Sequence, residues 1–447
     1  MNVVSESEGA RARVHAIATR AKIAARHLAA TSAATRHAVL ERIAAALRED
    51  ADAILSANAR DTTAALEAVG RGEMSPSLFK RLVLDGAAVA GMAHKVSAVA
   101  ALDDPLGRVV RQATLDDHLD LEQVTCPLGV VAAIFEARPD AMTQIAALAL
   151  ASGNAVLLKP GCEVEHTARA LERTMRCSLE AVPDIPSGAV ALLEGRAAVD
   201  ALLELDGIVD LIVPRGSKEL VRSIQSRTRI PVLGHADGIC HVYIDAAADP
   251  AIAVDVVLDS KVQYAAACNA AEVVLIHRVA VPRVAEALVS QLAACGVEIR
   301  ACARTRAALP AHDLRSATEV DWRTEFGDLR IAIKVVKDVN EAIDHINDHG
   351  SRHTDAIITG DDEAAARFLA GVDSANVFHN VSTRFADGFR YGLGAEVGIS
   401  TGKLHARGPV GLDGLTTTRW LLRGNGHVVA GHRRACGQAR RKGTPYR

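Results

Sequence analysis

Short, wholly apolar runs alternate with amphipathic helical segments over residues 130–213. We expect strands at residues 130–135, 155–158, 190–193 and 208–213, with helices between them at 142–152, 165–179 and 197–205. A strand that is apolar along its whole length is buried on both faces, which is typical of a parallel sheet covered by helices. This part of the chain is therefore predicted to form a Rossmann-like α/β sheet.

A second α/β block is predicted between residues 238 and 371. Its expected strands are 241–244, 272–277, 297–300, 331–336 and 355–359, and its expected helices are 282–294 and 340–347. The first part of the chain places Ala, Ile and Leu at helical spacing, which predicts helices at 10–30, 32–48 and 77–96. Residues 109–124 are predicted to form a hairpin that turns near Asp116 and Asp117.

Composition narrows the class of protein. At 447 residues the chain has room for two or three domains, and with 3% aromatic residues its core must consist of Ala, Val, Leu and Ile. A net charge of -3 argues against nucleic-acid binding, and no apolar run is long enough to span a membrane. The acidic, polar first residues do not resemble a signal peptide. The eight cysteines form no CxxC pair and the 17 histidines no HExxH motif, so we expect a cytoplasmic protein without a metal site.

Cys268 lies in a run of small residues between a helical segment at 251–261 and the strand at 272–277. Small neighbours let a substrate approach the sulfur, and a thiolate with a lowered pKa can form a thioester. A lone cysteine is more often a buried packing residue. The remaining motifs must therefore decide between a nucleophile and a packing residue.

Two strand ends are suited to binding a dinucleotide, although the GxGxxG fingerprint is absent. The first ends in Lys159-Pro160-Gly161, where a lysine can meet the adenosine ribose or a 2′-phosphate. The second ends in Arg215-Gly216-Ser217 and opens a helix, whose N-terminus can bind a pyrophosphate. Taken singly, each segment can also be an ordinary surface lysine or strand-to-helix turn.

In order and spacing, a series of long segments resembles the aldehyde dehydrogenase superfamily and, more narrowly, its glutamate-5-semialdehyde dehydrogenases, also called gamma-glutamyl phosphate reductases. The segments are CPLGVVAAIFEARPD (126–140), GNAVLLKPG (153–161), DLIVPRGSKELV (210–221), IPVLGHADGICHVYID (230–245), AAACNAAEVVLIH (265–277), INDHGSRHTDAIIT (346–359) and STRFADGFRYGLGAEVGISTGKLHARGP (382–409). The resemblance covers residues 10–428. It implies an α/β, aldehyde-dehydrogenase-like fold, with two Rossmann-like parallel-sheet domains and a small β extension for oligomerisation.

The resemblance also implies a reaction, the NADPH-dependent reduction of L-glutamyl 5-phosphate to L-glutamate 5-semialdehyde and phosphate. This is the second step of proline biosynthesis from glutamate. Cys268 would attack the acyl phosphate, and hydride would reduce the resulting thioester. The backbone N–H of Cys268 and the side chain of Asn269 are candidate donors to the oxyanion. Arg138 can meet the phosphate or the oxyanion, or can instead form an ion pair with Glu136 or Asp140.

Hydrolytic members of the superfamily carry a glutamate general base before a Gly-Gly pair. The equivalent run here is Val232-Leu233-Gly234-His235, which has no carboxylate. Water activation is therefore missing, as suits a reductase whose thioester must not hydrolyse. The alternatives are another aldehyde dehydrogenase or acylating reductase with a different acyl substrate, and a nucleotide-binding protein that has lost catalysis.

The remaining site residues are also implied by the resemblance. Glu325, followed by Phe326-Gly327, is expected to hold the nicotinamide ribose. Ser382, Thr383 and Arg384 are expected to bind the α-carboxylate and amine of the substrate. In a glycine-framed loop, His405 and Arg407 are expected to approach the phosphate, with subunit contact as the alternative.

The predicted division of the chain has four parts: an NADP-binding domain (1–108 and 126–237), a catalytic domain carrying Cys268 (238–395), an oligomerisation extension (109–125 and 396–428) and a basic tail (429–447). The last 17 residues hold six Lys/Arg and no acid. We expect this tail to be disordered, with nucleic-acid contact as the minor alternative. The resemblance implies a homodimer or higher homo-oligomer and a functional pairing with a separate glutamate 5-kinase.

Cofactor choice gives the first testable prediction. NAD-preferring relatives place a glutamate three residues after the lysine, where it repels a 2′-phosphate, and this chain has Cys162 there. NADPH is therefore predicted over NADH, although Glu163 lies one residue further on. Replacing Lys159 with Ala should raise the KM for NADPH more than the KM for NADH in steady-state assays. Equal effects on both cofactors would contradict the assignment of Lys159.

Overall fold

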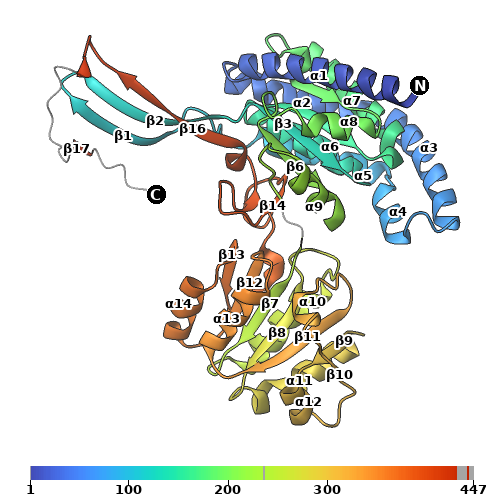
Figure 1. Ribbon diagram of the computed structural model, residues 1–447, viewed down its shortest axis with the longest axis vertical. Helices are drawn as coiled ribbons and strands as arrows, with labels where there is room; N and C mark the ends of the chain where they lie inside the picture. The colour runs from blue at the N-terminus through green and yellow to red at the C-terminus, as the bar shows by residue number, and fades with distance from the viewer. Residues whose placement is uncertain (1, 235–236, 430–439, 442–447) are drawn as a thin grey trace.

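The computed structural model describes residues 2–234, 237–429 and 440–441. Two α/β bodies lie one above the other in Figure 1, and a β-ribbon projects away from both. The first body contains a four-stranded sheet and the second a seven-stranded sheet. The predicted α/β fold with two Rossmann-like parallel sheets is confirmed.

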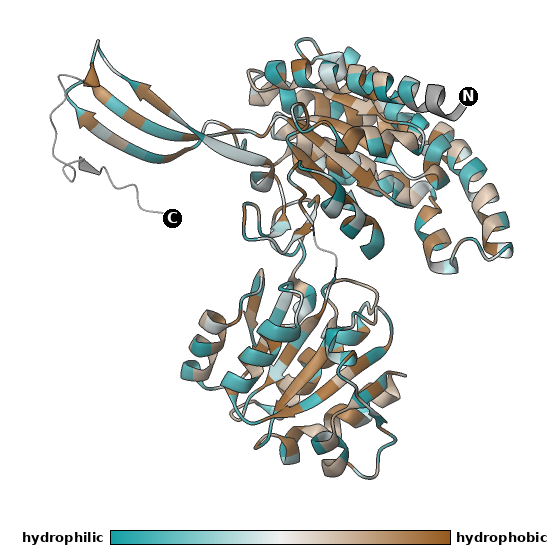
Figure 2. Ribbon diagram, in the orientation of Figure 1, coloured by the Kyte–Doolittle hydropathy of each residue, from teal (hydrophilic) through white to brown (hydrophobic). Residues whose placement is uncertain are grey.

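The sheet of the first body is parallel, with strand order β5-β4-β3-β6. Its strands are β3 (Val130–Phe135), β4 (Ala155–Pro160), β5 (Val190–Leu192) and β6 (Leu211–Arg215). Every residue of β3 and β4 is buried, which explains why these runs are apolar without alternation. Figure 2 shows these strands as a hydrophobic layer inside the body.

The helices of the first body pack on this sheet or on one another. They are α1 (Asn2–Leu28), α2 (Ala33–Glu49), α3 (Ala51–Gly70), α4 (Pro76–Leu82), α5 (Gly86–Ala100), α6 (Pro139–Ala151), α7 (Glu165–Glu180), α8 (Ala197–Leu203) and α9 (Lys218–Arg227). Helices α1 and α6 contact β3 and β4 directly, and α2 packs on α5 and α7. None of the described helices is long and apolar enough to cross a membrane.

The N-terminal helices differ from the prediction in two places. Helix α3 was not predicted, because the residues it buries include Asn58 and Asp61, which break the apolar periodicity. The segment 77–96 is two helices rather than one. Asp85 caps α5 by accepting a hydrogen bond of 2.7 Å from the N–H of Ala88. Asn58 bonds the chain on both sides of residue 83, at the Leu82 carbonyl and the Leu84 N–H, and so fixes the break.

The second body is a parallel sheet of order β10-β9-β11-β8-β7-β12-β13. Its strands are β7 (Cys240–Ile244), β8 (Ala271–His277), β9 (Glu298–Ala301), β10 (Arg315–Ser316), β11 (Arg330–Val336), β12 (Thr354–Ile358) and β13 (Asn376–His379). Its helices are α10 (Pro250–Val262), α11 (Val281–Ala294), α12 (Ala303–Ala308), α13 (Val339–His349) and α14 (Asp362–Gly371). The sequence reading missed α12, α14 and the two edge strands β10 and β13.

The projecting ribbon is antiparallel and contains β1 (Val109–Asp116), β2 (Leu119–Pro127) and β16 (Thr416–Arg423). The hairpin predicted at 109–124 is therefore present. Strands β14 (Gly398–Ser400) and β15 (Gly408–Val410) lie outside the ribbon in a two-stranded sheet of their own.

Only part of the predicted extension at 396–428 thus belongs to the ribbon. Val397, Val410, Leu412 and Leu415 instead pack in the hydrophobic core of the first body. Within the predicted basic tail, β17 (Arg440–Arg441) pairs with β1. Residues 430–439 and 442–447 lie outside the described chain.

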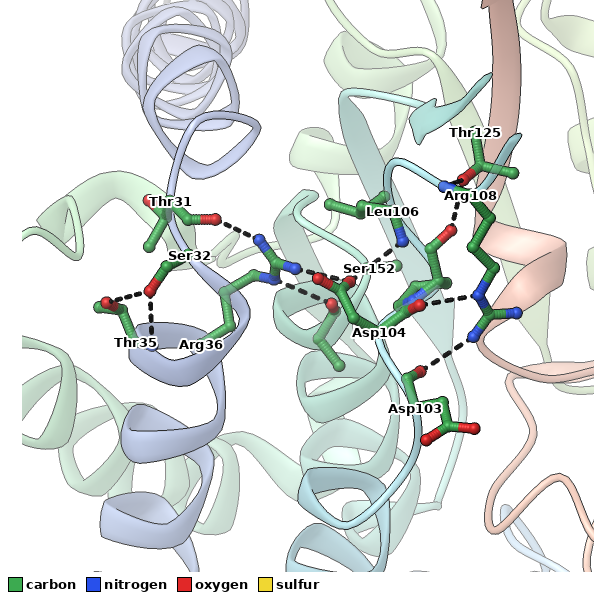
Figure 3. Close-up of polar contacts among 12 residues, drawn as sticks. Thr31, Ser32, Thr35, Arg36, Asp103, Asp104, Leu106, Arg108, Thr125 and Ser152 are labelled. Atoms are coloured by element: carbon green, nitrogen blue, oxygen red, sulfur yellow. Dashed lines mark hydrogen bonds and ion pairs between the residues drawn. The ribbon is translucent and has the colours of Figure 1, made fainter. Parts of the chain in front are cut away.

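A buried arginine joins the N-terminal helices to the base of the ribbon (Figure 3). Arg36 of α2 is 2% exposed, and its guanidinium donates to the carbonyls of Thr31 and Ala151 and to the carboxylate of Asp104, at 2.7 Å. The main chain of Asp104 in turn accepts from Arg108, just before β1. One side chain therefore fixes α2, the end of α6 and the segment that leads into the ribbon.

Replacing Arg36 with Met should lower the free energy of unfolding of the first body by about 2 kcal/mol, because two carbonyls and a half-buried carboxylate lose their donor. Urea titration followed by circular dichroism would measure the shift. The matched control is Arg42→Met on the same helix, where an exposed ion pair with Glu49 is lost. That change should cost less than about 0.5 kcal/mol. Equal losses in the two variants would show that the Arg36 contacts contribute no special stability.

Candidate active site

A cavity of about 510 Å³ lies between the two bodies. On the side of the first body it is lined by residues that follow β3 and β6, namely Glu136, Arg138 and 215–217. Because the carboxyl ends of parallel strands meet at one edge of a sheet, these residues come together. On the side of the second body the cavity is lined by the loop that carries Cys268.

The Cys268 loop connects the end of α10 to the start of β8. Two hydrogen bonds between residues three apart turn its backbone, from the Ala267 N–H to the Tyr264 carbonyl and from the Ala270 N–H to the Ala267 carbonyl. Cys268 itself is half-buried. Below it, a Cβ built on Gly238 would lie 2.1 Å from the Cys268 carbonyl oxygen, so only glycine fits there. The position of the thiol thus depends on backbone contact with the chain that leads into β7.

Arginine side chains from both bodies line this cavity. Arg81, Arg138 and Arg215 come from the first body and Arg384 from the second. Among the described residues, the side chains of the first three form no ion pair. Burial, together with the positive charges of Arg215 and Arg81, lowers the pKa of Arg138. Carboxylates such as Glu325 and Glu396 line the cavity too, so an anion would bind where the guanidinium groups without an ion pair lie together, around Arg138.

Arg384 is 8% exposed and is held in place by hydrogen bonds. Its Nε donates to Gln263 at 2.8 Å, and its guanidinium lies 5.9 Å from the centre of the Tyr264 ring. Burial and the neighbouring Arg390 lower the pKa of Arg384, whereas Cys268 acts in the opposite direction. Arg384 and Cys268 line the same cavity.

The alternative role for Arg138, an ion pair with a neighbouring carboxylate, is not seen among the described residues. Glu136 accepts a hydrogen bond from the Ser217 N–H at 2.8 Å, and Asp140 pairs with Lys95 at 3.7 Å. Arg138 therefore keeps its donors available to the cavity.

A second cavity, of about 260 Å³, lies beside the first at the carboxyl ends of β3 and β4. Lys159, Pro160 and Gly161 line it, and Glu136 lines both cavities. Lys159 is 6% exposed, its Nζ donates to the Pro160 carbonyl, and burial lowers its pKa. The two predicted dinucleotide segments thus line adjoining cavities, as one elongated ligand would require.

Two carboxylates of this region are engaged with backbone groups. Glu163 accepts from the Ala137 N–H at 2.6 Å. Glu136 occupies the Ser217 N–H, which the sequence assigned to a pyrophosphate, and the Ser217 hydroxyl caps α9 by accepting from Leu220. A pyrophosphate at this helix end would have to displace the Glu136 carboxylate.

Of the remaining predicted site residues, some line the cavity and others do not. Asn269 and Glu325 line the cavity with Cys268, but the Asn269 amide donates to the Ala386 carbonyl at 2.8 Å. Ser382 and Thr383 are buried behind Arg384 and outside the cavity wall.

His405 and Arg407 lie in the loop between β14 and β15, and neither lines the cavity. The Arg407 guanidinium forms an ion pair with Asp373 at 3.1 Å instead, so the geometry gives no support to a contact with the phosphate.

Residues 2–304 match the aldehyde dehydrogenase family. The chain belongs to this family. It is 53% identical over 410 residues to the gamma-glutamyl phosphate reductase of Synechococcus sp. (strain JA-2-3B'a(2-13)), covering 92% of this chain and 90% of that protein. It is 49% identical to the gamma-glutamyl phosphate reductase of Haloquadratum walsbyi, with 92% and 91% covered.

Solved structures agree. The crystal structure of gamma-glutamyl phosphate reductase from Thermotoga maritima superposes with a TM-score of 0.89 at 36% identity, covering 93% of this chain and 99% of that one. The glyceraldehyde-3-phosphate dehydrogenase GapN of Methanocaldococcus jannaschii, solved with NADP, has a TM-score of 0.65 at 16% identity, covering 93% and 95%, and shares the fold.

Membership of the aldehyde dehydrogenase family makes the chain an oxidoreductase that uses a nicotinamide cofactor. The residues present fit such a group: the cavity with the buried Lys159 adjoins the cavity with Cys268 and Glu325. Among the described residues, no group of three or more His, Cys, Asp or Glu side chains could hold a metal ion.

Sequence reasoning missed several residues of this aldehyde dehydrogenase site. Arg81, Tyr264 and Glu396 line the cavity, and Gly238 supports the Cys268 loop. No local pattern marks Arg81, because it reaches the site through the packing of α4. Tyr264 could have been found, since it lies four residues before Cys268 in a chain with only four tyrosines.

The contact below Cys268 gives a testable prediction for this family member. Gly238→Ala should displace the Cys268 backbone and lower kcat by about 100-fold, because a shift of about 1 Å in a reacting group has effects of this size. The control is Gly234→Ala, at a nearby glycine in the cavity wall, where the added methyl would lie 3.4 Å from Pro214 in ordinary contact. Steady-state kinetics on variants with native circular dichroism would test this. Equal activities in the two variants would contradict it.

Proposed function

We propose that this chain catalyses the NADPH-dependent reduction of L-glutamyl 5-phosphate to L-glutamate 5-semialdehyde and phosphate, the second step of proline biosynthesis from glutamate. The observation that carries the proposal is that Cys268 lies in one cavity with arginines from both bodies. A thiol supplies the nucleophile, and the arginines supply counter-charges for a substrate that is anionic at both ends. The relatives that share half of the sequence carry the name of this reductase.

The chemistry begins at Cys268. Its sulfur attacks the acyl carbon, the bond from that carbon to the phosphate oxygen breaks, and inorganic phosphate leaves with the electron pair. The backbone N–H of Cys268 stabilises the oxyanion that forms on the way. When bound, the nicotinamide supplies the hydride that reduces the thioester. The thiolate of Cys268 then leaves as the aldehyde is released, and is ready for the next cycle.

Arg138 is the proposed partner of the departing phosphate. Its donors are free of carboxylates among the described residues, and Arg81 and Arg215 add positive charge around it. Guanidinium groups bind phosphate in a bidentate manner, and charge that develops on the leaving oxygen is stabilised most strongly in a site with little water. The three arginines therefore favour the step in which phosphate leaves.

Arg384 is the proposed partner of the α-carboxylate of the substrate. It reaches the cavity from the second body, on the same side as Cys268, and Gln263 fixes its orientation. Ser382 and Thr383 act indirectly: Ser382 accepts from the Arg384 backbone N–H, and the Thr383 N–H donates to Ser260. A role for them in contacting the substrate amine is weaker, because both are buried behind the cavity wall.

The cavity also supports a reductase over a hydrolase. Leu233 and Gly234 line it at the place where hydrolytic relatives carry their glutamate base. Neither Leu233 nor Gly234 can act as a general base, so no side chain at this position activates water against the thioester before hydride arrives. Phosphate rather than water is then the natural partner of the acyl group in both directions.

NADPH is the proposed form of the cofactor. Lys159 lines the second cavity with Cys162, and Glu163 turns its carboxylate to the Ala137 N–H. Each of these features leaves positive charge available to a 2′-phosphate. Residues 1–108 and 126–237 would form the cofactor domain, and 238–395 the catalytic domain.

The ribbon is the proposed oligomerisation element, since Val109, Val110, Trp420 and Leu422 are exposed on it. A homodimer or higher homo-oligomer would cover these side chains. Because acyl phosphates are labile, the substrate must come from a kinase that phosphorylates glutamate, and a functional pairing with a glutamate 5-kinase follows. The reaction requires a reduced Cys268, which supports a cytoplasmic location.

The decisive experiment runs the reaction backward. Glutamate semialdehyde, NADP and phosphate are mixed with the wild type or with Cys268→Ala, and NADPH absorbance is followed. Turnover that needs phosphate and disappears in Cys268→Ala is expected. Turnover without phosphate would point to a hydrolytic aldehyde dehydrogenase. If NADPH binds but no turnover occurs with or without phosphate, the acyl substrate differs or catalysis has been lost.

A further inference from the structure

A fully buried ion pair closes the base of the Cys268 loop. Lys261, in the last turn of α10, places its Nζ 2.7 Å from Oε2 of Glu272, the second residue of β8. Both side chains are 0% exposed. The two residues bracket the segment 262–271, which contains Cys268. The pair thus ties the two ends of the loop together.

The second oxygen of Glu272 reaches another part of the site. Oε1 accepts a hydrogen bond of 3.3 Å from the Gly327 N–H, and Glu325, two residues before Gly327, lines the cavity. One carboxylate therefore bonds both to the base of the Cys268 loop and to the loop expected to hold the nicotinamide ribose. Burial raises the pKa of Glu272, and Lys261 and the Gly327 N–H oppose that effect.

The residue before Lys261 extends the same arrangement to the substrate side. The Ser260 hydroxyl donates to the Ser382 hydroxyl at 3.2 Å and accepts from the Thr383 N–H at 3.1 Å. Ser382 and Thr383 directly precede Arg384. The end of α10 is thus bonded directly to Glu272, which follows the Cys268 loop, and to the segment before Arg384, and it is connected to the Glu325 loop through Glu272.

We propose that Lys261 and Glu272 are positioning residues that hold the thiol of Cys268 in register with the Glu325 loop. The physical reason is that a buried ion pair gives little net stability, because both charges must leave water, and it loses most of its value unless its geometry is exact in distance and angle. The presence of such a pair is best explained by the segments that it holds in place. This pair fixes the loop that carries the nucleophile and connects it to the cofactor side.

Two double variants separate the two connections. Lys261→Met with Glu272→Gln removes both charges and keeps a side-chain oxygen for Gly327. Lys261→Met with Glu272→Leu removes that oxygen as well. The control is Tyr243→Phe with Asp245→Asn, which removes a buried hydrogen bond of 2.8 Å in the same body but outside the cavity wall.

The expected results combine activity with two readouts that need no acyl substrate. Both Lys261 variants should lower kcat by about 100-fold, with the KM for semialdehyde within about two-fold, because the thiol is misplaced while the substrate groups remain. Iodoacetamide should modify Cys268 about ten-fold faster, as the released loop opens, while the exposed Cys295 keeps its rate. Only the Leu variant should also weaken NADPH binding, by about ten-fold, measured by nucleotide fluorescence.

The proposal is overturned if iodoacetamide modifies Cys268 in a folded Lys261 double variant at the wild-type rate. It is also overturned if the control variant raises the rate of Cys268 modification as much as the Lys261 variants do. If a double variant does not fold, Lys261→Arg is the substitute: it keeps the charge but alters the distance, and wild-type kcat in that variant would refute the proposal. The inference rests on the proposed function only for the role of Glu325. If the acyl substrate is a different one, thiol modification and NADPH binding still test it.

Discussion

The cavity depends on which edges of the two sheets face each other. The first body presents the carboxyl edge of its parallel strands, where the residues after β3, β4 and β6 converge on Glu136, Lys159 and Arg215. The second body presents the amino edge, because Cys268 and Gly238 lie just before β8 and β7. Loops at a carboxyl edge open helices and suit the binding of ligands. The Cys268 loop is a short connection between the end of α10 and the start of β8. Because both of its ends are fixed, it can hold the thiol in one position.

Four charged side chains are buried close to that junction. Lys261, Glu272, Lys159 and Arg384 are all less than a tenth exposed and lie at or beside the two cavities. Moving a charge out of water is costly, and the cores of both bodies are otherwise built from small aliphatic residues. The cost of burying these four charges is therefore explained by the geometry that they fix at the junction rather than by a gain in stability.

The fold could be predicted where burial leaves a local pattern. Strands β3 and β4 are buried along their whole length, and apart from Lys159 at the end of β4 their sequences are apolar. Helix α3 was missed because two of its buried positions are Asn58 and Asp61, whose partners lie far along the chain. The same limit applies to the site. Arg138 and Arg215 follow strands and could be placed from strand order, whereas Arg81 and Gly238 reach the site only through tertiary packing.

The arginines of the cavity are divided between the two bodies, and this division affects which substrates can bind. Under the proposed function, the substrate carries a phosphate at one end and an α-carboxylate at the other, with the reacting carbon next to the phosphate. Arg138 and Arg215 belong to the first body, and Arg384 and Cys268 to the second. A ligand with two anionic ends is then bound fully only when it spans both bodies. An acyl group with a single charge would leave the arginines of one body without a counter-charge, and it would gain less from binding than a ligand that pairs with both sets. Selection against such acyl groups thus follows from the way the charges are divided between the bodies.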